Sequence, residues 1–216
     1  MNMAAAPALL VATRSAGKVR ELLPMLREAG FRGVTLDEAG LAPDPAEDGI
    51  EAFDTFEDNA IAKARWFSVR AGGMPVLADD SGLAVDALGG APGVRSKRWA
   101  WGSGLDGLAL DAANNAKLAR ELSGAADRGA RYVCVAAIAW NGHEVHARGE
   151  CVGRILHEPQ GTGGFGYDPW FWSEELGTGF GLASLEAKAQ VSHRGRAMRA
   201  VLAALARVVD PLRARD

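Results

Sequence analysis

The sequence predicts an α/β fold in one domain over residues 1–216, with a β-sheet that is at least partly antiparallel. Short apolar runs typical of buried strands alternate with segments of helical periodicity, of which Ala60–Ala71 and Asp111–Leu122 are the clearest. The dipeptide Asn141-Gly142 between two strand-like segments predicts a hairpin, and a hairpin requires antiparallel pairing. With 48% hydrophobic residues, the chain can bury the core of one large domain or of two closely joined lobes.

The charge balance argues against a protein that binds nucleic acid along an extended surface. The chain has 24 Lys and Arg residues against 27 Asp and Glu residues, a formal net charge of -3. A phosphate backbone needs a surplus of Lys and Arg, which this composition lacks. A small polyanion bound together with a metal ion is compatible with it.

Cysteine usage and the N-terminus indicate an intracellular protein. Cys134 and Cys151 lie in strand-like segments without CxxC spacing, which favours buried thiols in a reducing compartment over a zinc site or a redox pair. Met1–Ala12 is apolar but has no basic region, so it is a poor signal peptide. No apolar run is long enough to span a membrane. We therefore expect a soluble, cytoplasmic protein.

The chain begins with a strand, a polar loop and a helix. Ala8–Ala12 predicts a buried strand, Thr13–Lys18 predicts a loop, and Val19–Leu26 shows helical spacing. This order favours an anion, because the free N–H groups and the positive end of a helix face the loop. Lys18 would add a positive charge, although the loop lacks the first glycine and the hydroxyl residue of a Walker A motif. A solvated lysine at a helix start is the plainer interpretation.

An acidic segment separates the first helix from the second. Val34–Leu36 predicts a short edge strand, and Leu41–Asp58 is rich in carboxylates and is interrupted by Pro and Gly. Such a run is usually a solvated loop, but one of its members can reach a metal ion. Asn59, near the start of the helix Ala60–Ala71, can cap that helix or contact a site.

Two adjacent aspartates mark the centre of the chain. The apolar run Val76–Ala78 leads to Asp79 and Asp80, and Ser81 and Gly82 follow. Neighbouring side chains of an extended segment point to opposite faces, so we expect the strand to end here with one carboxylate in a site. A carboxylate beside a hydroxyl and a flexible glycine suits Mg²⁺ and phosphate oxygens. The same residues also fit an ordinary turn between two strands.

Two long strands and a glycine-rich stretch follow. Arg131–Trp140 is rich in Val, Ile and Ala, as a central buried strand is, and Val145–Val152 is its return strand. Gly161–Pro169 is dense in glycine, which lets the backbone and the rings of Phe165 and Tyr167 approach a flat ligand. The alternative is a flexible loop with two packing aromatics.

The last helix of the sequence is rich in Ala and Leu and ends near Val209. Lys188, His193 and Arg194 lie just before it or at its start, where they can hold a phosphate or a base. Taken alone, they would be surface residues.

Three long motifs occur in the order seen in one family. They are ADDSGLAVDALGGAPGVRSKRW, GTGGFGYDPWF and SHRGRA, with support from ATRSAGK and TFEDNAIAKA. The chain resembles the inosine triphosphate pyrophosphatase-like, Ham1-type enzymes, which hydrolyse noncanonical purine nucleoside triphosphates. The resemblance covers nearly the full length.

The resemblance implies an architecture and a reaction. The architecture is an elongated two-lobed α/β fold with a central mixed β-sheet flanked by helices and a nucleotide cleft between the lobes, usually as a homodimer. The reaction converts a nucleoside triphosphate such as ITP, dITP or XTP and water into the monophosphate and pyrophosphate, with Mg²⁺ as cofactor. If Thr13–Lys18 and the metal hold the distal phosphates as the leaving pyrophosphate, we expect water activated at Asp80 to attack the α-phosphorus.

The resemblance also implies site residues. Asp80 is the expected general base and a metal ligand. Contacts to the phosphates, the sugar or the base are expected from Thr13, Arg14, Ser15, Ala16, Gly17, Lys18, Ser81, Phe165, Gly166, Tyr167, Asp168, Lys188, His193 and Arg194. Inosine and xanthine carry a 6-oxo group where adenine carries an amine, so donors at this site would reject ATP.

Two positions depart from the family's pattern. Ser15 stands where the family usually has Asn, and a shorter side chain loses the amide donors. The family's Glu-x-Gly-x-Thr-Phe run is interrupted by extra residues when it is read from Glu47, which we favour as the second metal ligand, with Asp58 next. The alternatives are a pyrophosphatase for modified or pyrimidine triphosphates, a nucleotide sensor with weak turnover and, more distantly, a nucleic-acid-binding module.

Overall fold

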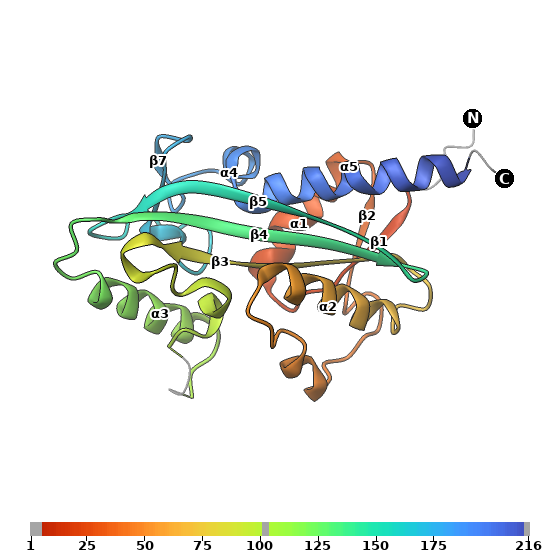
Figure 1. Ribbon diagram of the computed structural model, residues 1–216, viewed down its shortest axis with the longest axis horizontal. Coiled ribbons are helices and arrows are strands. Elements are labelled where there is room, and N and C mark those ends of the chain that lie inside the picture. Colours follow the sequence, from red (N-terminus) through yellow and green to blue (C-terminus); the bar gives the residue numbers. More distant parts are fainter. Residues whose placement is uncertain (1–5, 101–103, 214–216) are drawn as a thin grey trace. The chain divides into compact units, whose positions relative to one another are not determined.

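The computed structural model describes residues 6–100 and 104–213, with residues 209–213 described by their backbone alone. Within these residues, seven strands form one mixed sheet in the order β2-β1-β3-β4-β5-β6-β7 (Figure 1). The strands are β1 (Ala8–Val11), β2 (Arg32–Thr35), β3 (Val76–Val85), β4 (Gly129–Trp140), β5 (His143–Ile155), β6 (Phe171–Ser173) and β7 (Thr178–Gly179). The α-helices are α1 (Ala16–Glu28), α2 (Phe56–Ser68), α3 (Gly107–Glu121), α4 (Leu185–Val191) and α5 (His193–Arg213).

The sheet combines parallel and antiparallel pairs. Strand β1 pairs in parallel with β2 and β3, whereas β6 pairs antiparallel with β5 and β7. Asn141 and Gly142 join β4 to β5 with φ values of 45° and 78°, the left-handed conformation that a two-residue hairpin turn requires. The predicted hairpin, the edge position of β2 and the central position of β4 are confirmed.

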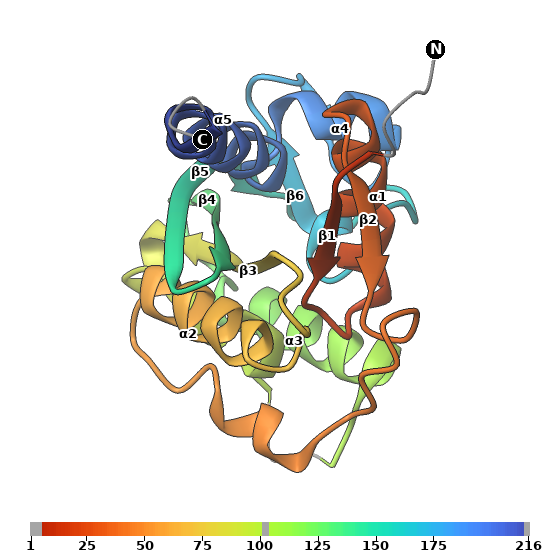
Figure 2. The ribbon, with the colours of Figure 1, turned by 90° about the vertical axis from the view of Figure 1, so that its right-hand side faces the viewer.

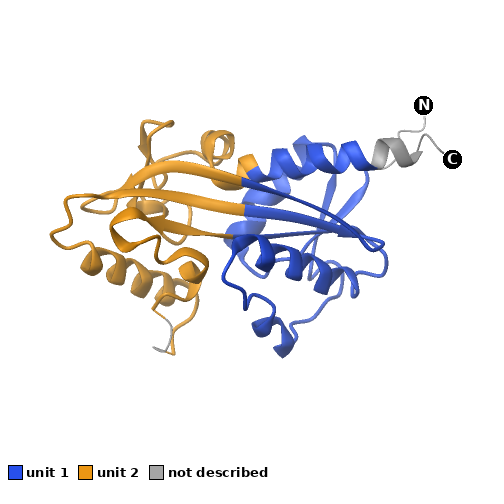
Figure 3. Ribbon diagram, in the orientation of Figure 1, with its two compact units in different colours: residues 1–80, 135–148, 197–216 blue, residues 81–134, 149–196 orange. Residues whose placement is uncertain are grey.

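The chain forms two compact units (Figure 3). Unit 1 contains residues 1–80, 135–148 and 197–216, and unit 2 contains residues 81–134 and 149–196. Strands β3, β4 and β5 contribute residues to both, and β3 passes from one unit to the other after Asp80. The prediction of a single domain with a nucleotide cleft between lobes stays a prediction.

Unit 1 is built on the apolar strand β1 and amphipathic helices. Leu22 and Leu26 of α1 are buried four residues apart on one helix face, as are Ala60 and Ala64 of α2. Figures 1 and 2 show α2 and α5 on opposite sides of the β4–β5 hairpin. Strand β1 pairs with the start of β3, Leu10 with Val76 and Val11 with Leu77.

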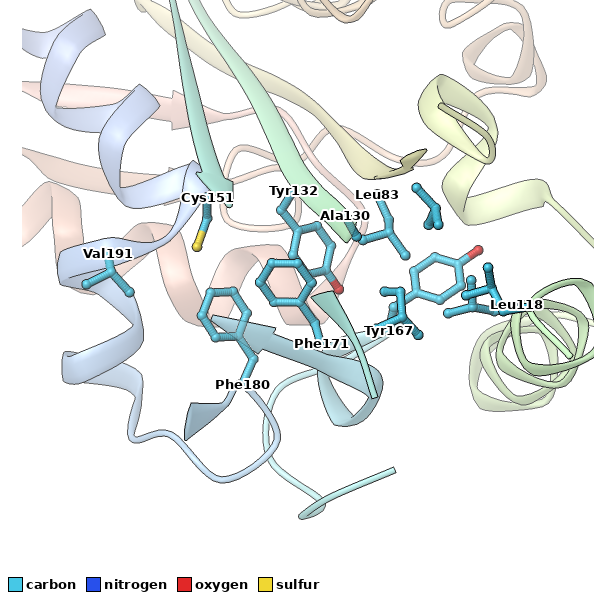
Figure 4. Packing of buried hydrophobic residues seen from close by; sticks show 12 residues of the cluster. Leu83, Leu118, Ala130, Tyr132, Cys151, Tyr167, Phe171, Phe180 and Val191 are labelled. Carbon is cyan, nitrogen blue, oxygen red and sulfur yellow. The ribbon is translucent and has the colours of Figure 1, made fainter. Parts of the chain in front are cut away.

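Unit 2 has a core rich in aromatic residues (Figure 4). The ring of Tyr132 lies 4.7 Å from that of Phe171 and 5.9 Å from that of Phe180, measured between centroids. Tyr167 belongs to the same core and is 5% exposed. Large rings of this kind bury much apolar surface, so they fix the glycine-rich loop around Tyr167 to the core.

The expected end of the central strand is wrong, and so is the alternative of a turn. Strand β3 runs without interruption through Asp79, Asp80, Ser81 and Gly82. Asp79 is 1% exposed and Asp80 is 6% exposed. Asp79 is paired with Lys18 of α1 and Asp80 accepts from Asn59 of α2, so the strand does not need to end where the carboxylates begin.

Three helices start before the periodic apolar pattern that predicted them. Helix α1 begins at Ala16 instead of Val19, α2 begins at Phe56, and α3 begins at Gly107. Ser15 and Thr55 cap the first two helices, each accepting a hydrogen bond from a backbone N–H of the first turn. The caps lie outside the apolar pattern, so apolar periodicity does not mark the start of α1 or α2. Among the described residues, no helix is long and apolar enough to cross a membrane.

Candidate active site

Unit 1 contains a group of charged and polar side chains that we term the carboxylate–lysine cluster. Its members come from α1, the segment before α2, α2 itself and β3. They are Lys18, Glu51, Asn59, Lys63, Asp79 and Asp80.

Lysines neutralise Asp79. The Lys18 Nζ atom lies 3.1 Å from Asp79 Oδ2 and donates to the Asp79 carbonyl at 3.3 Å. Lys63 Nζ donates to the same carbonyl at 3.0 Å. A buried carboxylate requires such a partner, because removing an unpaired charge from water costs several kcal/mol. The plainer interpretation of Lys18 as a solvated surface lysine is therefore wrong.

Asp80 accepts a hydrogen bond from an amide. Asn59 Nδ2 donates to Asp80 Oδ2 at 2.9 Å, and Asn59 is itself fixed by hydrogen bonds with both the N–H and the carbonyl of Phe53. Burial raises the pKa of Asp80 to about 6, the charge of Glu51 adds to the rise, and Lys18, Lys63 and Asn59 oppose it. A carboxyl group with this pKa accepts a proton readily near neutral pH.

Glu51 lies beside Lys63. The distance from Lys63 Nζ to Glu51 Oε1 is 2.5 Å. Burial acts to raise the pKa of Glu51, but the fields of Lys63 and Lys18 outweigh it and the pKa is lowered. Glu51 is therefore ionised at neutral pH, and its negative charge acts on Asp80.

The pair Asp80 and Glu51 fits a hard divalent cation. Their like charges raise the pKa of Asp80, and a divalent cation would relieve that repulsion. Mg²⁺ keeps several waters and binds one or two carboxylates together with substrate phosphates. Among the described residues, no three His, Cys, Asp or Glu side chains form a metal-binding group. A site of two carboxylates that substrate completes is consistent with both facts.

The structure does not bring Glu47 or Asp58 to Asp80. Both carboxylate oxygens of Glu47 accept from Arg14, at 3.1 and 2.8 Å. Asp58 is exposed at the start of α2 and accepts from the Thr55 hydroxyl at 2.6 Å. Their expected metal role stays a prediction that this geometry does not favour.

The loop before α1 has the form of an anion site. Ser15 Oγ accepts from the Lys18 N–H, and Thr13 Oγ1 accepts from the Ser15 N–H. Ala16 and Gly17 are the first residues of the helix, where backbone N–H groups have no carbonyl partner within the helix. Ser15 caps α1 as well as the family's Asn would, so the substitution preserves the helix start.

Unit 2 contains a second group, which we term the aromatic–cation cluster. Its members are Phe165, Asp168, Phe180, Lys188 and Arg194. Lys188 Nζ lies 2.6 Å from Asp168 Oδ2, and both side chains are buried. The same ammonium group lies 5.3 Å from the ring centroid of Phe165 and 5.2 Å from that of Phe180, within the range of a cation–π contact.

Arg194 is the other cation of this cluster. It is 2% exposed, donates from Nη2 to the Ser81 hydroxyl at 2.8 Å, and has its guanidinium carbon 5.6 Å from the Phe165 ring centroid. Phe165 is partly exposed and lies near both cations. The predicted site residues Ser81, Phe165, Asp168, Lys188 and Arg194 are thus brought together within unit 2.

Tyr167 and His193 lie in the core. The Tyr167 hydroxyl donates to the carbonyl of Ser96 at 2.8 Å, and burial followed by the charge of Asp111 raises its pKa, so it remains a neutral donor. The ring of His193 stacks on Tyr132 with a centroid distance of 4.5 Å. Tyr167 therefore supports the glycine-rich loop, and His193 supports the start of α5.

The sequence interpretation missed Glu51 and Lys63. Glu51 lies four residues before Thr55, which is the spacing of the family's Glu-x-Gly-x-Thr-Phe run when it is read without insertion, with Phe53 in place of Gly. Lys63 lies four residues after Asn59, so both side chains occupy one face of α2. Both spacings can be read from the sequence, but only the contacts with Asp79 and Asp80 of β3 show that these residues belong to one cluster.

Known proteins resemble this chain over most of its length. A model of the Ham1 family matches residues 9–204. A dITP/XTP pyrophosphatase of Syntrophobacter fumaroxidans is 47% identical over 88% of this chain and 78% of that protein. The Nocardia farcinica protein of the same name is 46% identical over 94% and 96%. The structure of a HAM1 protein from Coxiella burnetii has a TM-score of 0.75 at 33% identity, covering 93% of this chain and 99% of that one.

Proposed function

Because the chain belongs to the Ham1 family, we propose that it is a pyrophosphatase that hydrolyses dITP, ITP and XTP to the monophosphate and pyrophosphate. Relatives named dITP/XTP pyrophosphatase support this substrate class. The observation that carries the proposal is Asp80, a buried carboxyl group with a pKa of about 6 beside two lysines and a second carboxylate. This group suits proton transfer next to a polyanion.

Asp80 serves as the general base for the attacking water. A base is most efficient when its pKa lies near the working pH; burial raises the pKa of Asp80 towards neutral pH in the metal-free protein, and a bound cation would lower it again. Asn59 donates to one oxygen of the carboxylate, which fixes the orientation of the group. Proximity and orientation of this kind lower the barrier by removing entropy before the reaction.

Asp80 and Glu51 would hold Mg²⁺. When bound, the ion lowers the pKa of water and offsets phosphate charge. The proposal rests on the charge repulsion between the two carboxylates and on the oxygen ligands that Mg²⁺ prefers. Lys63 keeps Glu51 ionised, and therefore ready to bind a cation.

The segment Thr13–Lys18 would bind the phosphates. The N-terminus of α1 favours negative charge, and Lys18 lies at the edge of the carboxylate–lysine cluster with a side chain that is 15% exposed. If these groups hold the two distal phosphates, charge that develops on the leaving pyrophosphate meets cations already in place. Water would then attack the α-phosphorus.

The aromatic–cation cluster would recognise the base. Phe165 can stack on a purine, and Lys188 and Arg194 donate hydrogen bonds that a 6-oxo group accepts. The 6-amino group of ATP is itself a donor and offers no acceptor to these cations. Such a mismatch rejects a substrate strongly, by about 10⁴–10⁵-fold where the donors are fully buried.

Turnover of a panel of triphosphates with Mg²⁺ tests the function. We expect dITP, ITP and XTP to release pyrophosphate and ATP to react far more slowly, and equal kcat/KM for ITP and ATP would contradict the base assignment. Hydrolysis in ¹⁸O-labelled water tests the bond that breaks. Label in the monophosphate supports attack at the α-phosphorus, and label in pyrophosphate contradicts it. Release of single orthophosphates would exclude a pyrophosphatase.

We also propose a homodimer in the cytoplasm. Unit 2 exposes the large apolar side chains of Leu105, Leu108 and Leu185, which a second copy could cover. Cys134 and Cys151 are free and buried, as suits a reducing compartment. Light scattering after size-exclusion chromatography tests the dimer, and a monomeric mass would contradict it. Cell fractionation tests the location.

A further inference from the structure

Helix α3 holds both polar backbone groups of Gly166 with two of its side chains. Asp111 Oδ2 accepts from the Gly166 N–H at 3.3 Å, and Asn115 Nδ2 donates to the Gly166 carbonyl at 3.0 Å. The two residues lie four positions apart, so they project from one helix face. Gly166 has a φ of 58°, in the left-handed region that glycine adopts without strain and other residues rarely adopt.

These two contacts immobilise the peptide units on either side of Gly166. The N–H belongs to the peptide unit shared with Phe165, and the carbonyl belongs to the unit shared with Tyr167. Rotation about the Gly166 backbone bonds would break one contact or the other. The freedom that glycine would otherwise give this loop is therefore removed.

The remaining backbone groups of Phe165 are held as well. Its N–H donates to Asp168 Oδ2 at 2.8 Å, and its carbonyl accepts from the Asp168 N–H at 3.2 Å. Asp168 also binds Lys188, so this side of Phe165 is tied to the aromatic–cation cluster. Asp111 completes the set by fixing the peptide unit that follows Phe165.

We propose that Asp111 and Asn115 are positioning residues for base recognition, acting through Gly166 to hold the Phe165 ring beside Lys188 and Arg194. The proposal rests on the proposed function, because it assigns the ring to the base. Neither residue touches the ring's cation partners in the contacts described above; each acts through the backbone. Preorganising an aromatic surface lowers the ordering cost of binding a flat ligand.

The chemistry of Asp111 supports a specific role in this contact. Burial raises its pKa, and the hydrogen bond from Gly166 and the charge of Lys97 act in the opposite direction. A half-buried carboxyl group costs free energy wherever it has no polar partner. Leu118 of α3 and Leu122 just after it already belong to the buried core of unit 2, so the attachment of the helix does not depend on this carboxyl group.

Hydrogen–deuterium exchange of residues 161–172 tests the clamp without any substrate. In Asp111→Leu and in Asn115→Ala, we expect exchange in this segment to rise by about tenfold, the effect of losing one hydrogen bond. Asp111→Asn keeps an acceptor oxygen and should restore exchange close to that of the wild type. Asn114→Ala is the matched control, because Asn114 binds the Ala100 N–H and the Lys97 carbonyl instead of the loop.

Steady-state kinetics test the link to the base. We expect KM for dITP to rise by about tenfold in Asp111→Leu and Asn115→Ala with a smaller change in kcat, and the preference for dITP over dATP to fall by a similar factor. Asp111→Asn should stay close to the wild type in both quantities. A merely structural role would reduce thermal stability without changing base preference.

Each outcome decides a different point. Unchanged exchange in 161–172, or an equal rise in Asn114→Ala, overturns the clamp. Faster exchange with unchanged KM and base preference overturns its role in base recognition. If the wild type hydrolyses no triphosphate, the proposed function fails and the base role fails with it, whereas the exchange data still decide whether the clamp exists.

Discussion

The carboxylate–lysine cluster of unit 1 and the aromatic–cation cluster of unit 2 both bury charges, but with opposite surpluses. The first combines three carboxylates, Glu51, Asp79 and Asp80, with the lysines at positions 18 and 63. The second combines the cations Lys188 and Arg194 with the single carboxylate of Asp168. The first cluster can accept a divalent cation, and the second can donate to an acceptor-rich ligand.

The difference shows how a chain with a net charge of -3 can bind a triphosphate. The carboxylate–lysine cluster has an excess of negative charge, to which a cation would bind. The aromatic–cation cluster has an excess of positive charge, which lies beside the ring of Phe165. Each surplus is small, because unpaired buried charge is costly.

Removing the proposed base in unit 1 should have the largest effect. Asp80→Asn keeps the volume and the hydrogen bond from Asn59 but removes the proposed proton acceptor and cation ligand, so we expect kcat to fall by about 10³–10⁴-fold. Asp79→Asn should reduce turnover less, since Asp79 is paired with Lys18. Pyrophosphate release with dITP measures both. Wild-type turnover in Asp80→Asn would show that the base lies elsewhere.

Removing a cation in unit 2 should destabilise the fold more than any single change in exposed charge. Lys188→Met leaves Asp168 buried without its ammonium partner, and we expect a loss of about 3–5 kcal/mol in the free energy of unfolding. The double variant Lys188→Met with Asp168→Asn should recover most of that stability but none of the preference for dITP over dATP. Denaturant unfolding and kinetics measure the two effects, and a stable single variant would mean that the pair is not needed.

Two glutamates of the acidic segment provide a matched pair. Glu51→Gln removes a charge beside Asp80, so we expect apparent affinity for Mg²⁺ and turnover to fall by about 10²-fold. Glu47→Gln removes only the partner of Arg14, and we expect a change of about threefold or less, as for an exposed ion pair. Titration of activity with Mg²⁺ measures both. The reverse order would restore Glu47 as the metal ligand.

The smallest expected effect concerns stability and pH in metal-free buffer. The pKa of Asp80 is raised from 3.8 to about 6 on folding, so the folded state binds this proton more tightly. Its contribution to stability is therefore present below pH 4 and is lost as pH rises to 6. The Asp80→Asn variant has no carboxyl group to ionise at this position, so its stability does not fall in this way as pH rises. At pH 8 we expect it to be more stable than the wild type by about 1–3 kcal/mol.

Thermal unfolding of wild type and variant across this pH range measures the effect. Addition of Mg²⁺ should stabilise the wild type and not the variant, because only the wild type keeps both carboxylates. Equal stability of the two proteins at pH 8 without metal would contradict the burial cost assigned to Asp80.

Much of the fold was predictable from local pattern. Apolar runs predicted β1 and β4, and Asn141-Gly142 predicted the hairpin, because such signals depend on a few neighbouring residues. Helix starts were not predicted, since the caps Ser15 and Thr55 lie outside the apolar pattern. The strand end expected at Asp79 was wrong because partners from α1 and α2, distant in sequence, satisfy the carboxylates.

For this protein, the sequence by itself determined the longer strands and helices and their order and singled out Asp80 and the glycine-rich loop, whereas β6, β7 and α4 were not predicted. Only the tertiary structure decided that Glu51 instead of Glu47 lies near Asp80, that Lys63 and Asn59 join them, and that α3 holds Gly166. The periodicity of apolar residues indicates which side of a helix or strand faces the core. Which residues meet there depends on the packing of segments far apart in the chain, because electrostatic and hydrogen-bond energies arise only at contact distance.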